Sequence, residues 1–199
     1  NSNLRYNNFF VVKKIEVVGL DKSNNLLLEK KLLDLIGYNI FTLKRESFKF
    51  INSINFVKDY NVKKIYPNQI KVYLVSAEPL SIIEYLNEVV VLGNNEKIIN
   101  LENFPTNLPK VTGTNDIKKV FQTLKMINKS NLDIENIKKI KFFPSDRIDV
   151  EFRNNIKIRF PVNFTIDNLN FSLRLLENSE LNKPKILDLR IPNKVITYD

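Results

Sequence analysis

The chain has 199 residues, 43% of them hydrophobic and 11% aromatic, which is enough apolar content to bury a core in one domain or in two small ones. Its 31 Lys and Arg outnumber its 22 Asp and Glu, and the resulting net charge of +9 attracts anionic partners. The sequence contains no Cys and no His, which excludes disulfides, thiol catalysis, Cys-ligated zinc and histidine general bases.

The first part of the chain predicts a strand followed by a helix. Residues 9–20 read FFVVKKIEVVGL, a run of strand-forming side chains that ends at Gly19. Ser23 is predicted to cap a helix, and Gly37 is predicted to end it. The apolar positions that this helix places on one face are Leu28, Leu32, Leu35 and Ile36.

A second, shorter helix and an antiparallel hairpin are expected next, over residues 43–53, 57–66 and 70–77. The order strand, helix, helix, strand, strand predicts a small sheet with two helices on one face. Glu78 and Pro79 break the last strand, so we expect one domain over residues 1–78 and a second over residues 79–199.

The second domain is predicted to be mainly antiparallel β with two helices, which makes the chain α+β overall. Short apolar runs separated by turn residues predict strands over 81–86, 89–92, 97–101, 137–143, 147–152 and 156–160. One helix is expected after Asn115 or Asp116 and another over residues 167–176, because apolar side chains recur there at helical spacing.

The last stretch, KILDLRIPNKVITYD over residues 185–199, predicts two strands. Alternation places Leu187, Leu189 and Ile191 on one face of the first strand and Ile186, Asp188 and Arg190 on the other. After a break at residues 192–194, the four strand-forming residues 195–198 follow. A strand at this place is expected to be an open edge, which offers unpaired N–H and C=O groups to another chain.

The sequence predicts no catalytic, cofactor-binding or metal-binding residues. Asp149 and Glu151 share a strand face near Asp146, but we interpret them as a solvated face because the sequence indicates no pocket that would separate their pKa values. The four glycines are isolated from one another, whereas phosphate-binding loops need clustered glycines.

Nucleic-acid binding is an alternative that the hairpin of the first domain raises. Tyrosines and lysines alternate there, at Tyr60, Tyr66 and Tyr73 and at Lys63, Lys64 and Lys71. This arrangement can stack on single-stranded bases, but it is equally typical of ordinary cross-strand pairs, which we favour. The Lys and Arg residues are spread along the chain without a dense run, so no nucleic-acid partner is expected.

Several strings, in this order, resemble the FtsQ/DivIB family of bacterial cell-division proteins. FVVKKIEVVGL, followed by a helix and YNIF, is similar to the opening POTRA-type domain of that family. The later strings are similar to three further landmarks, and they read FVKDYNVKKIYPNQIKVYLVSAEPL, FPTNLPKVTG and ILDLRIPNKVITYD. The resemblance spans about residues 9–198, and Asp188-Leu189-Arg190 with Pro192 is particularly similar to alphaproteobacterial members.

The resemblance implies a non-catalytic scaffold of the divisome, the assembly that builds the division septum. It implies a single-pass protein of the cell inner membrane with this part in the periplasm, and the membrane helix would precede residue 1. The start at Asn rather than Met, with the polar leader NSNLRYNN, is consistent with a piece of a longer chain. The implied partners are small bitopic membrane proteins like FtsB and FtsL, bound through the last strand.

The predicted partner-binding residues are those of the last strand and the turn before it, Arg190, Ile191, Pro192, Asn193, Lys194, Val195, Ile196, Thr197 and Tyr198. Arg190 is expected to pair with a partner carboxylate, and Ile191, Val195 and Ile196 either contact the partner or pack in their own sheet. An alternative function is a POTRA chaperone module of an outer-membrane assembly or secretion machine. A hydrolase is disfavoured, because no nucleophile with a base is indicated.

Overall fold

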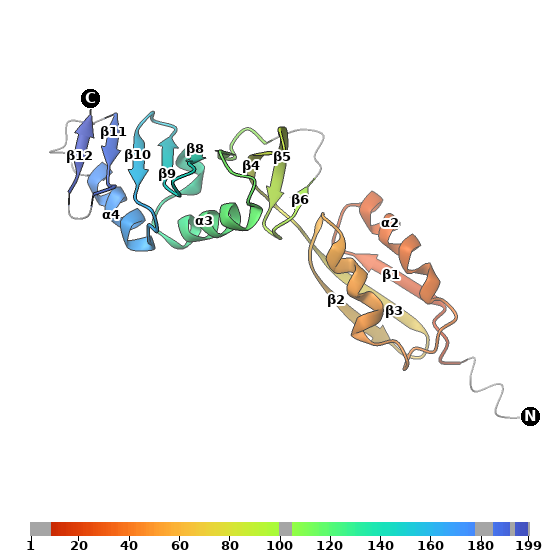
Figure 1. Ribbon diagram of the computed structural model, residues 1–199. Coiled ribbons are helices and arrows are strands. Elements are labelled where there is room, and N and C mark those ends of the chain that lie inside the picture. The colour runs from red at the N-terminus through yellow and green to blue at the C-terminus, as the bar shows by residue number, and fades with distance from the viewer. Residues whose placement is uncertain (1–8, 100–104, 178–184, 192–193, 199) are drawn as a thin grey trace, which may run out of the picture. The chain divides into compact units, whose positions relative to one another are not determined.

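The computed structural model describes residues 9–99, 105–177, 185–191 and 194–198. The chain divides into two compact units, Asn1–Glu78 and Pro79–Asp199, each with its own sheet (Figure 1). Helices and sheets occur in both units, so the predicted α+β class is confirmed.

The first unit contains a three-stranded sheet in the order β1-β3-β2. Its elements are β1 (Lys14–Val18), α2 (Lys22–Leu32), the 3-10 helices η1 (Leu33–Leu35) and η2 (Arg45–Ser53), β2 (Val57–Ile65) and β3 (Gln69–Ser76). Strand β1 runs parallel to β3, whereas β2 and β3 form the antiparallel hairpin that the sequence predicts. The predicted order of strands and helices is confirmed, although the second helix is a 3-10 helix.

Two predictions for the start of this unit are wrong in detail. Strand β1 has five residues, because Val11 before it forms an isolated bridge with Asn39 instead of extending the pairing with β3. The N-cap of α2 is Asp21 rather than Ser23, because the Asp21 carboxylate accepts the Asn24 N–H at 3.0 Å.

One hydrophobic core holds the first unit together. Leu28 and Leu32 of α2 and Phe48 and Ile51 of η2 are buried in the same cluster as Ile70 and Val72 of β3. The apolar periodicity of the sequence predicts inward side chains at the four positions of α2 and η2. Leu35 is half-buried and Ile36 is exposed. They leave the predicted helix face because α2 ends at Leu32 and the chain continues as the 3-10 helix η1.

The second unit is a nine-stranded sheet in the order β12-β11-β10-β9-β8-β7-β4-β5-β6. Its strands are β4 (Pro79–Tyr85), β5 (Glu88–Gly93), β6 (Ile98–Ile99), β7 (Lys110–Thr112), β8 (Ile137–Phe142), β9 (Ile148–Phe152), β10 (Lys157–Phe160), β11 (Ile186–Asp188) and β12 (Ile196–Tyr198). Its helices are α3 (Ile117–Lys129), the short η3 (Ile134–Asn136) and α4 (Ile166–Glu177). Five of the strand pairs are antiparallel, and β10 with β11, β4 with β7 and β7 with β8 are parallel.

The two faces of this sheet differ in chemistry. Helices α3 and α4 contribute Val120, Leu124, Ile127 and Leu169 to a core that also contains the apolar side chains of the central strands. Asp116 caps α3, and its carboxylate accepts the Lys119 N–H at 3.0 Å. It is one of the two residues, Asn115 and Asp116, that the sequence offers as the cap. The opposite face carries the charged side chains of β8 to β11.

Candidate partner-binding edge

Strand β12 is the outermost strand of the nine-stranded sheet. It pairs antiparallel with β11, and no other strand pairs with it within the described ranges (Figure 1). All three of its residues are exposed. An edge strand with exposed side chains and an unpaired side is a template for strand addition.

The hydrogen bonds of β11 determine which way its backbone groups point. The Leu189 N–H donates to the Arg159 carbonyl of β10 at 2.9 Å. Backbone groups alternate sides along a strand, so the N–H and C=O of Leu187 and Leu189 face β10. Those of Ile186 and Asp188 therefore face β12.

The register between β11 and β12 then identifies the free backbone groups. Ile186 lies opposite Tyr198, and Asp188 lies opposite Ile196, so Tyr198 and Ile196 direct their backbone groups back to β11. Thr197 lies between them and directs its N–H and C=O away from the sheet. Thr197 is therefore the residue of β12 that offers a donor and an acceptor to an incoming strand.

An open apolar groove lies beside the start of β12. It has a volume of about 680 Å³ and is lined by Pro161, Val162, Asn168, Phe171, Leu189, Ile191, Lys194 and Val195. Val162, Phe171, Ile191 and Val195 are among the exposed large hydrophobic side chains of the chain. Apolar side chains gathered in a groove next to a free strand edge are suited to anchor a partner segment.

Apart from Arg190, the predicted partner-binding residues fall into three groups. Ile191, Lys194 and Val195 line the groove, and Ile196, Thr197 and Tyr198 form the edge strand. Pro192 and Asn193 lie outside the described residues. Ile191 is 48% exposed, because β11 ends at Asp188 and Ile191 does not continue the buried face of that strand. The sequence reasoning missed Val162 and Phe171, which no local pattern connects with the terminal stretch.

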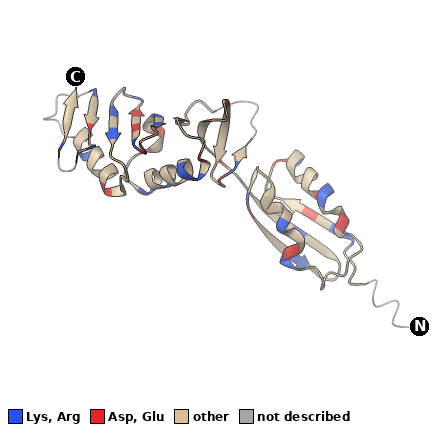
Figure 2. Cartoon of the chain, viewed as in Figure 1, with Lys and Arg blue, Asp and Glu red and all other residues tan. Residues whose placement is uncertain are grey.

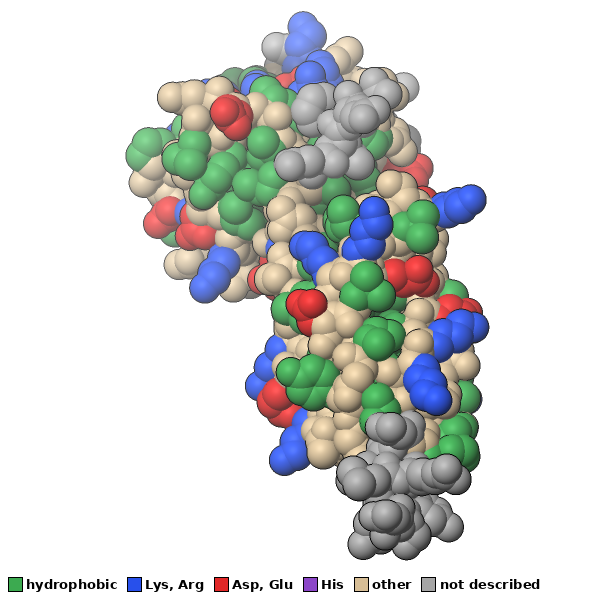
Figure 3. Space-filling view, turned by 90° about the vertical axis from the view of Figure 1, so that its right-hand side faces the viewer, with side chains coloured by type: hydrophobic (Ala, Val, Ile, Leu, Met, Phe, Trp, Pro, Cys, Tyr) green, Lys and Arg blue, Asp and Glu red, His purple; other side chains and the backbone are tan. Residues whose placement is uncertain are grey.

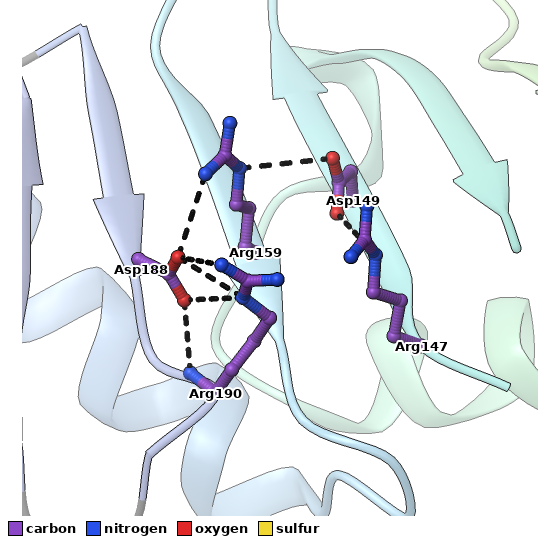
Figure 4. A network of polar contacts seen from close by, with 5 residues as sticks. All are labelled: Arg147, Asp149, Arg159, Asp188 and Arg190. Atoms are coloured by element: carbon purple, nitrogen blue, oxygen red, sulfur yellow. Dashed lines mark hydrogen bonds and ion pairs between the residues drawn. The ribbon is translucent and has the colours of Figure 1, made fainter. Parts of the chain in front are cut away.

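Arg190 is held by an intramolecular ion pair with Asp188 (Figure 4). The Arg190 Nε donates to the two Asp188 oxygens at 2.8 and 3.0 Å, its Nη2 donates to Oδ2 at 2.5 Å, and its backbone N–H donates to Oδ1 at 3.2 Å. From the neighbouring strand, the Arg159 Nη1 reaches Oδ2 at 3.5 Å. The Arg190 guanidinium is thus engaged within the chain, and a partner carboxylate would have to share it.

Asp188 is buried, with 3% of its surface exposed, although alternation places it on the solvent face of β11. The expectation of an exposed side chain is wrong because two arginines converge on the carboxylate and cover it. Hydrogen bonds from Arg190 hold the pKa of Asp188 below its ordinary value of 3.8. The Arg159 guanidinium also lies 5.6 Å from the ring centre of Tyr198, so the same network contacts β12.

Asp149 of β9 lies next to this network but, unlike Asp188, it is not hydrogen-bonded by the arginines. Charges of opposite sign alternate across β9, β10 and β11, and the Arg147 and Arg159 Nε atoms each lie 4.0 Å from the Asp149 carboxylate (Figures 2 and 4). These distances exceed that of a hydrogen bond, and Asp149 Oδ1 is buried with no hydrogen-bond partner among the residues that the structure describes. Burial raises the pKa of Asp149 above 3.8, against the lowering effect of the two arginines.

The predicted solvated face is therefore wrong for Asp149, whose exposed fraction is only 9%. The prediction of a solvated side chain holds for Glu151, which is partly exposed. Its Oε1 lies 2.8 Å from the Nζ of the exposed Lys138. Within the described ranges, no group of three or more carboxylates that could hold a metal ion occurs.

Replacing Asp149 by asparagine is expected to raise the free energy of unfolding at neutral pH by about 1 kcal/mol. The folded protein keeps the Asp149 proton to a higher pH than the unfolded chain does, so this group lowers stability as the pH rises from 3.8 through its folded pKa. Asparagine has no charge to desolvate, so its advantage should be present at neutral pH and shrink toward pH 4. Urea unfolding of both proteins at neutral pH and at pH 4 measures this difference in the free energy of unfolding.

A loss of stability in Asp149→Asn at neutral pH would contradict this reasoning. It would mean that the carboxylate stabilises the fold through its attraction to Arg147 and Arg159 more than its burial costs. Glu151→Gln is the matched control, because it removes a carboxylate of the same strand that is hydrogen-bonded and whose pKa is lowered chiefly by Lys138. That variant is expected to lose stability rather than gain it.

Comparisons with known proteins find matches among solved structures. No protein-family profile and no curated protein sequence matches the chain. A similar solved structure is the major extracytoplasmic domain of the trans isomer of the bacterial cell division protein DivIB from Geobacillus stearothermophilus, with a TM-score of 0.41 and 13% identity. The match covers 53% of this chain and 96% of that domain. Within the residues described for this chain, no helix is long and apolar enough to cross a bilayer.

Proposed function

We propose that this chain is a non-catalytic assembly scaffold of bacterial cell division, which captures a segment of a partner protein by strand addition at β12. The observation that carries the proposal is the outward-facing backbone of Thr197 beside an apolar groove. The division role rests on the ordered strings that resemble the FtsQ/DivIB family, which end on this same strand. That resemblance also places the chain, as part of the proposal, on the periplasmic side of the inner membrane.

The partner is proposed to be a small bitopic division protein, like FtsB or FtsL. One short strand pair on β12 supplies few hydrogen bonds, each worth about 1 kcal/mol net, so it cannot by itself offset the cost of ordering a segment. Apolar side chains of the partner seated among Val162, Phe171 and Val195 would provide the remaining free energy. We therefore propose a partner segment that combines a strand with an adjacent apolar stretch.

Replacing Thr197 by proline is expected to weaken partner binding at least about tenfold, because proline removes the outward N–H. The N–H of Thr197 makes no bond to β11, and proline is tolerated on the free side of an edge strand, so the fold should persist. Thr197→Ala is the matched control, because it removes the side chain and keeps the N–H. Binding of the extracytoplasmic segment of an FtsB-like protein from the same bacterium, measured by calorimetry, distinguishes the variants.

Equal affinity of the proline and alanine variants would overturn strand addition at β12. Failure of the unchanged protein to bind either an FtsB-like or an FtsL-like segment would overturn the proposed partner class.

A second candidate is the chaperone module, which the free edge of β2 favours. Strand β2 has nine residues and ends the sheet order of the first unit, with one side unpaired among the described residues. Such an edge can hold an unfolded strand. This function predicts that unfolded outer-membrane protein peptides bind the full chain and that Thr197→Pro leaves their affinity unchanged.

A further inference from the structure

The first unit carries an exposed aromatic cluster, made of Phe9, Phe10, Phe41 and Tyr66. The rings follow one another at centroid distances of 5.2 Å from Phe9 to Phe10, 5.0 Å from Phe10 to Phe41 and 5.1 Å from Phe41 to Tyr66. Phe9, Phe41 and Tyr66 are each more than half exposed. These edge-to-face, tilted and stacked ring contacts hold the rings together, yet leave a contiguous apolar surface in water, which marks an interaction site.

The same unit has a cavity with a basic rim, formed by segments that neighbour the cluster in the sequence. Its volume is about 410 Å³, and its lining residues are Leu43, Lys44, Arg45, Phe48, Tyr60, Asn61, Val62 and Lys64. The cavity is built from segments 43–48 and 60–64, and Phe41 and Tyr66 of the cluster lie two residues beyond those segments. Figure 3 shows hydrophobic and basic side chains close together on the surface of the first unit.

The cations of the rim have no acidic partner among the described residues. Lys44, Arg45 and Lys64 form no ion pair with a carboxylate of the described residues, whereas Glu46 pairs with Lys49 at 3.9 Å. The phenol oxygen of Tyr60 is buried and has no hydrogen-bond partner in the described part of the chain. Three cations around one cavity favour an anionic group with oxygen acceptors, such as a phosphate.

We propose that this surface, the aromatic cluster with its basic cavity, binds the interface of an anionic phospholipid bilayer. A phosphate headgroup would occupy the cavity, and the rings would enter the boundary between headgroups and acyl chains. Aromatic side chains and cations are the residue types that meet at that boundary. An acidic peptide would satisfy the cations but would leave Phe9 and Phe41 in water. A nucleic acid could stack its bases on the rings, and the experiment below distinguishes it from a bilayer. The inference concerns the first unit and does not depend on the partner proposed for β12.

Co-sedimentation of the full chain with vesicles tests the proposal. Binding is expected to vesicles of equimolar phosphatidylcholine and phosphatidylglycerol, to fall with rising salt, and to be lost on vesicles of phosphatidylcholine alone. The triple variant Lys44→Gln, Arg45→Gln, Lys64→Gln should bind the anionic vesicles at least about tenfold more weakly. Phe41→Ser should also weaken binding, although it changes no charge.

The matched control is the triple variant Lys118→Gln, Lys125→Gln, Lys129→Gln, which removes three exposed lysines of α3 and gives the same net charge. It should bind like the unchanged protein. An equal loss in both triple variants would overturn the proposal, because attraction would then follow net charge alone. Tight binding of inorganic phosphate, a polyglutamate peptide or an oligonucleotide, without binding to anionic vesicles, would overturn it as well. Circular dichroism of each variant verifies that it is folded.

Discussion

Replacing Asp188 by alanine is expected to lower the free energy of unfolding of the second unit by about 3 kcal/mol, the lower end of the cost of breaking a buried ion pair. The carboxylate is nearly inaccessible to water, whereas the side chains of Arg159 and Arg190 are 28% and 37% exposed and can be partly rehydrated. The substitution also removes the acceptor on which the turn after β11 is organised. Urea unfolding at neutral pH measures the loss.

The same substitution should loosen β12 before the whole unit unfolds. The N–H groups of Ile196 and Tyr198 face β11, so their hydrogen exchange should accelerate more in Asp188→Ala than the exchange of the β9 amides. The pKa of Asp188 is lowered, so its contribution to stability is present above 3.8 and is lost as the pH falls through its folded pKa. The difference between the two proteins should therefore shrink in acid.

Glu84→Ala is the control for this prediction, because Glu84 is an exposed carboxylate of β4 and its loss changes the net charge equally. It should shift stability by less than about 0.5 kcal/mol. If Asp188→Ala lowered the free energy of unfolding by no more than this, the network of Asp188 with Arg159 and Arg190 would have no structural role. Asp188 would then not stabilise β12. Strand addition at Thr197 would be unaffected by this result, because the Thr197→Pro variant tests it separately.

Local periodicity predicts much of this fold because side chains three or four residues apart share a helix face. Val120, Leu124 and Ile127 of α3 lie in the core as expected, and so do Phe48 and Ile51 of η2. The β2-β3 hairpin is also local, since a short turn joins its two strands. These elements need no information from distant parts of the chain.

The parts of the candidate site that were missed depend on contacts between distant residues. Alternation treats Asp188 as a solvent-facing residue, because the sequence does not reveal that Arg159, which lies 29 residues earlier, reaches it from β10. Phe171 joins the groove only because α4 lies near Leu189, Ile191 and Val195. The parallel pairing of β10 with β11 creates both arrangements, and parallel pairs leave no local turn signal.

Replacing Gly19 by alanine is expected to destabilise the first unit by about 3 kcal/mol or more, because two costs combine there. Gly19 has a φ of +112°, which L-residues rarely adopt. A Cβ at this position would also lie 2.0 Å from the Leu74 carbonyl oxygen, and the backbone of β3 cannot move away without disturbing the sheet. Urea unfolding, with hydrogen exchange to assign the loss to the first unit, measures the effect.

Gly37→Ala separates the two costs, because Gly37 has a similar φ of +91° but an added Cβ would meet no atom within 4 Å. That variant should lose only about 1 to 2 kcal/mol, the cost of a left-handed backbone for an L-residue. Equal losses in the two variants would mean that the approach of Gly19 to β3 is unimportant. The larger loss at Gly19 would instead show that close backbone contact between the end of β1 and β3 fixes the sheet of the first unit.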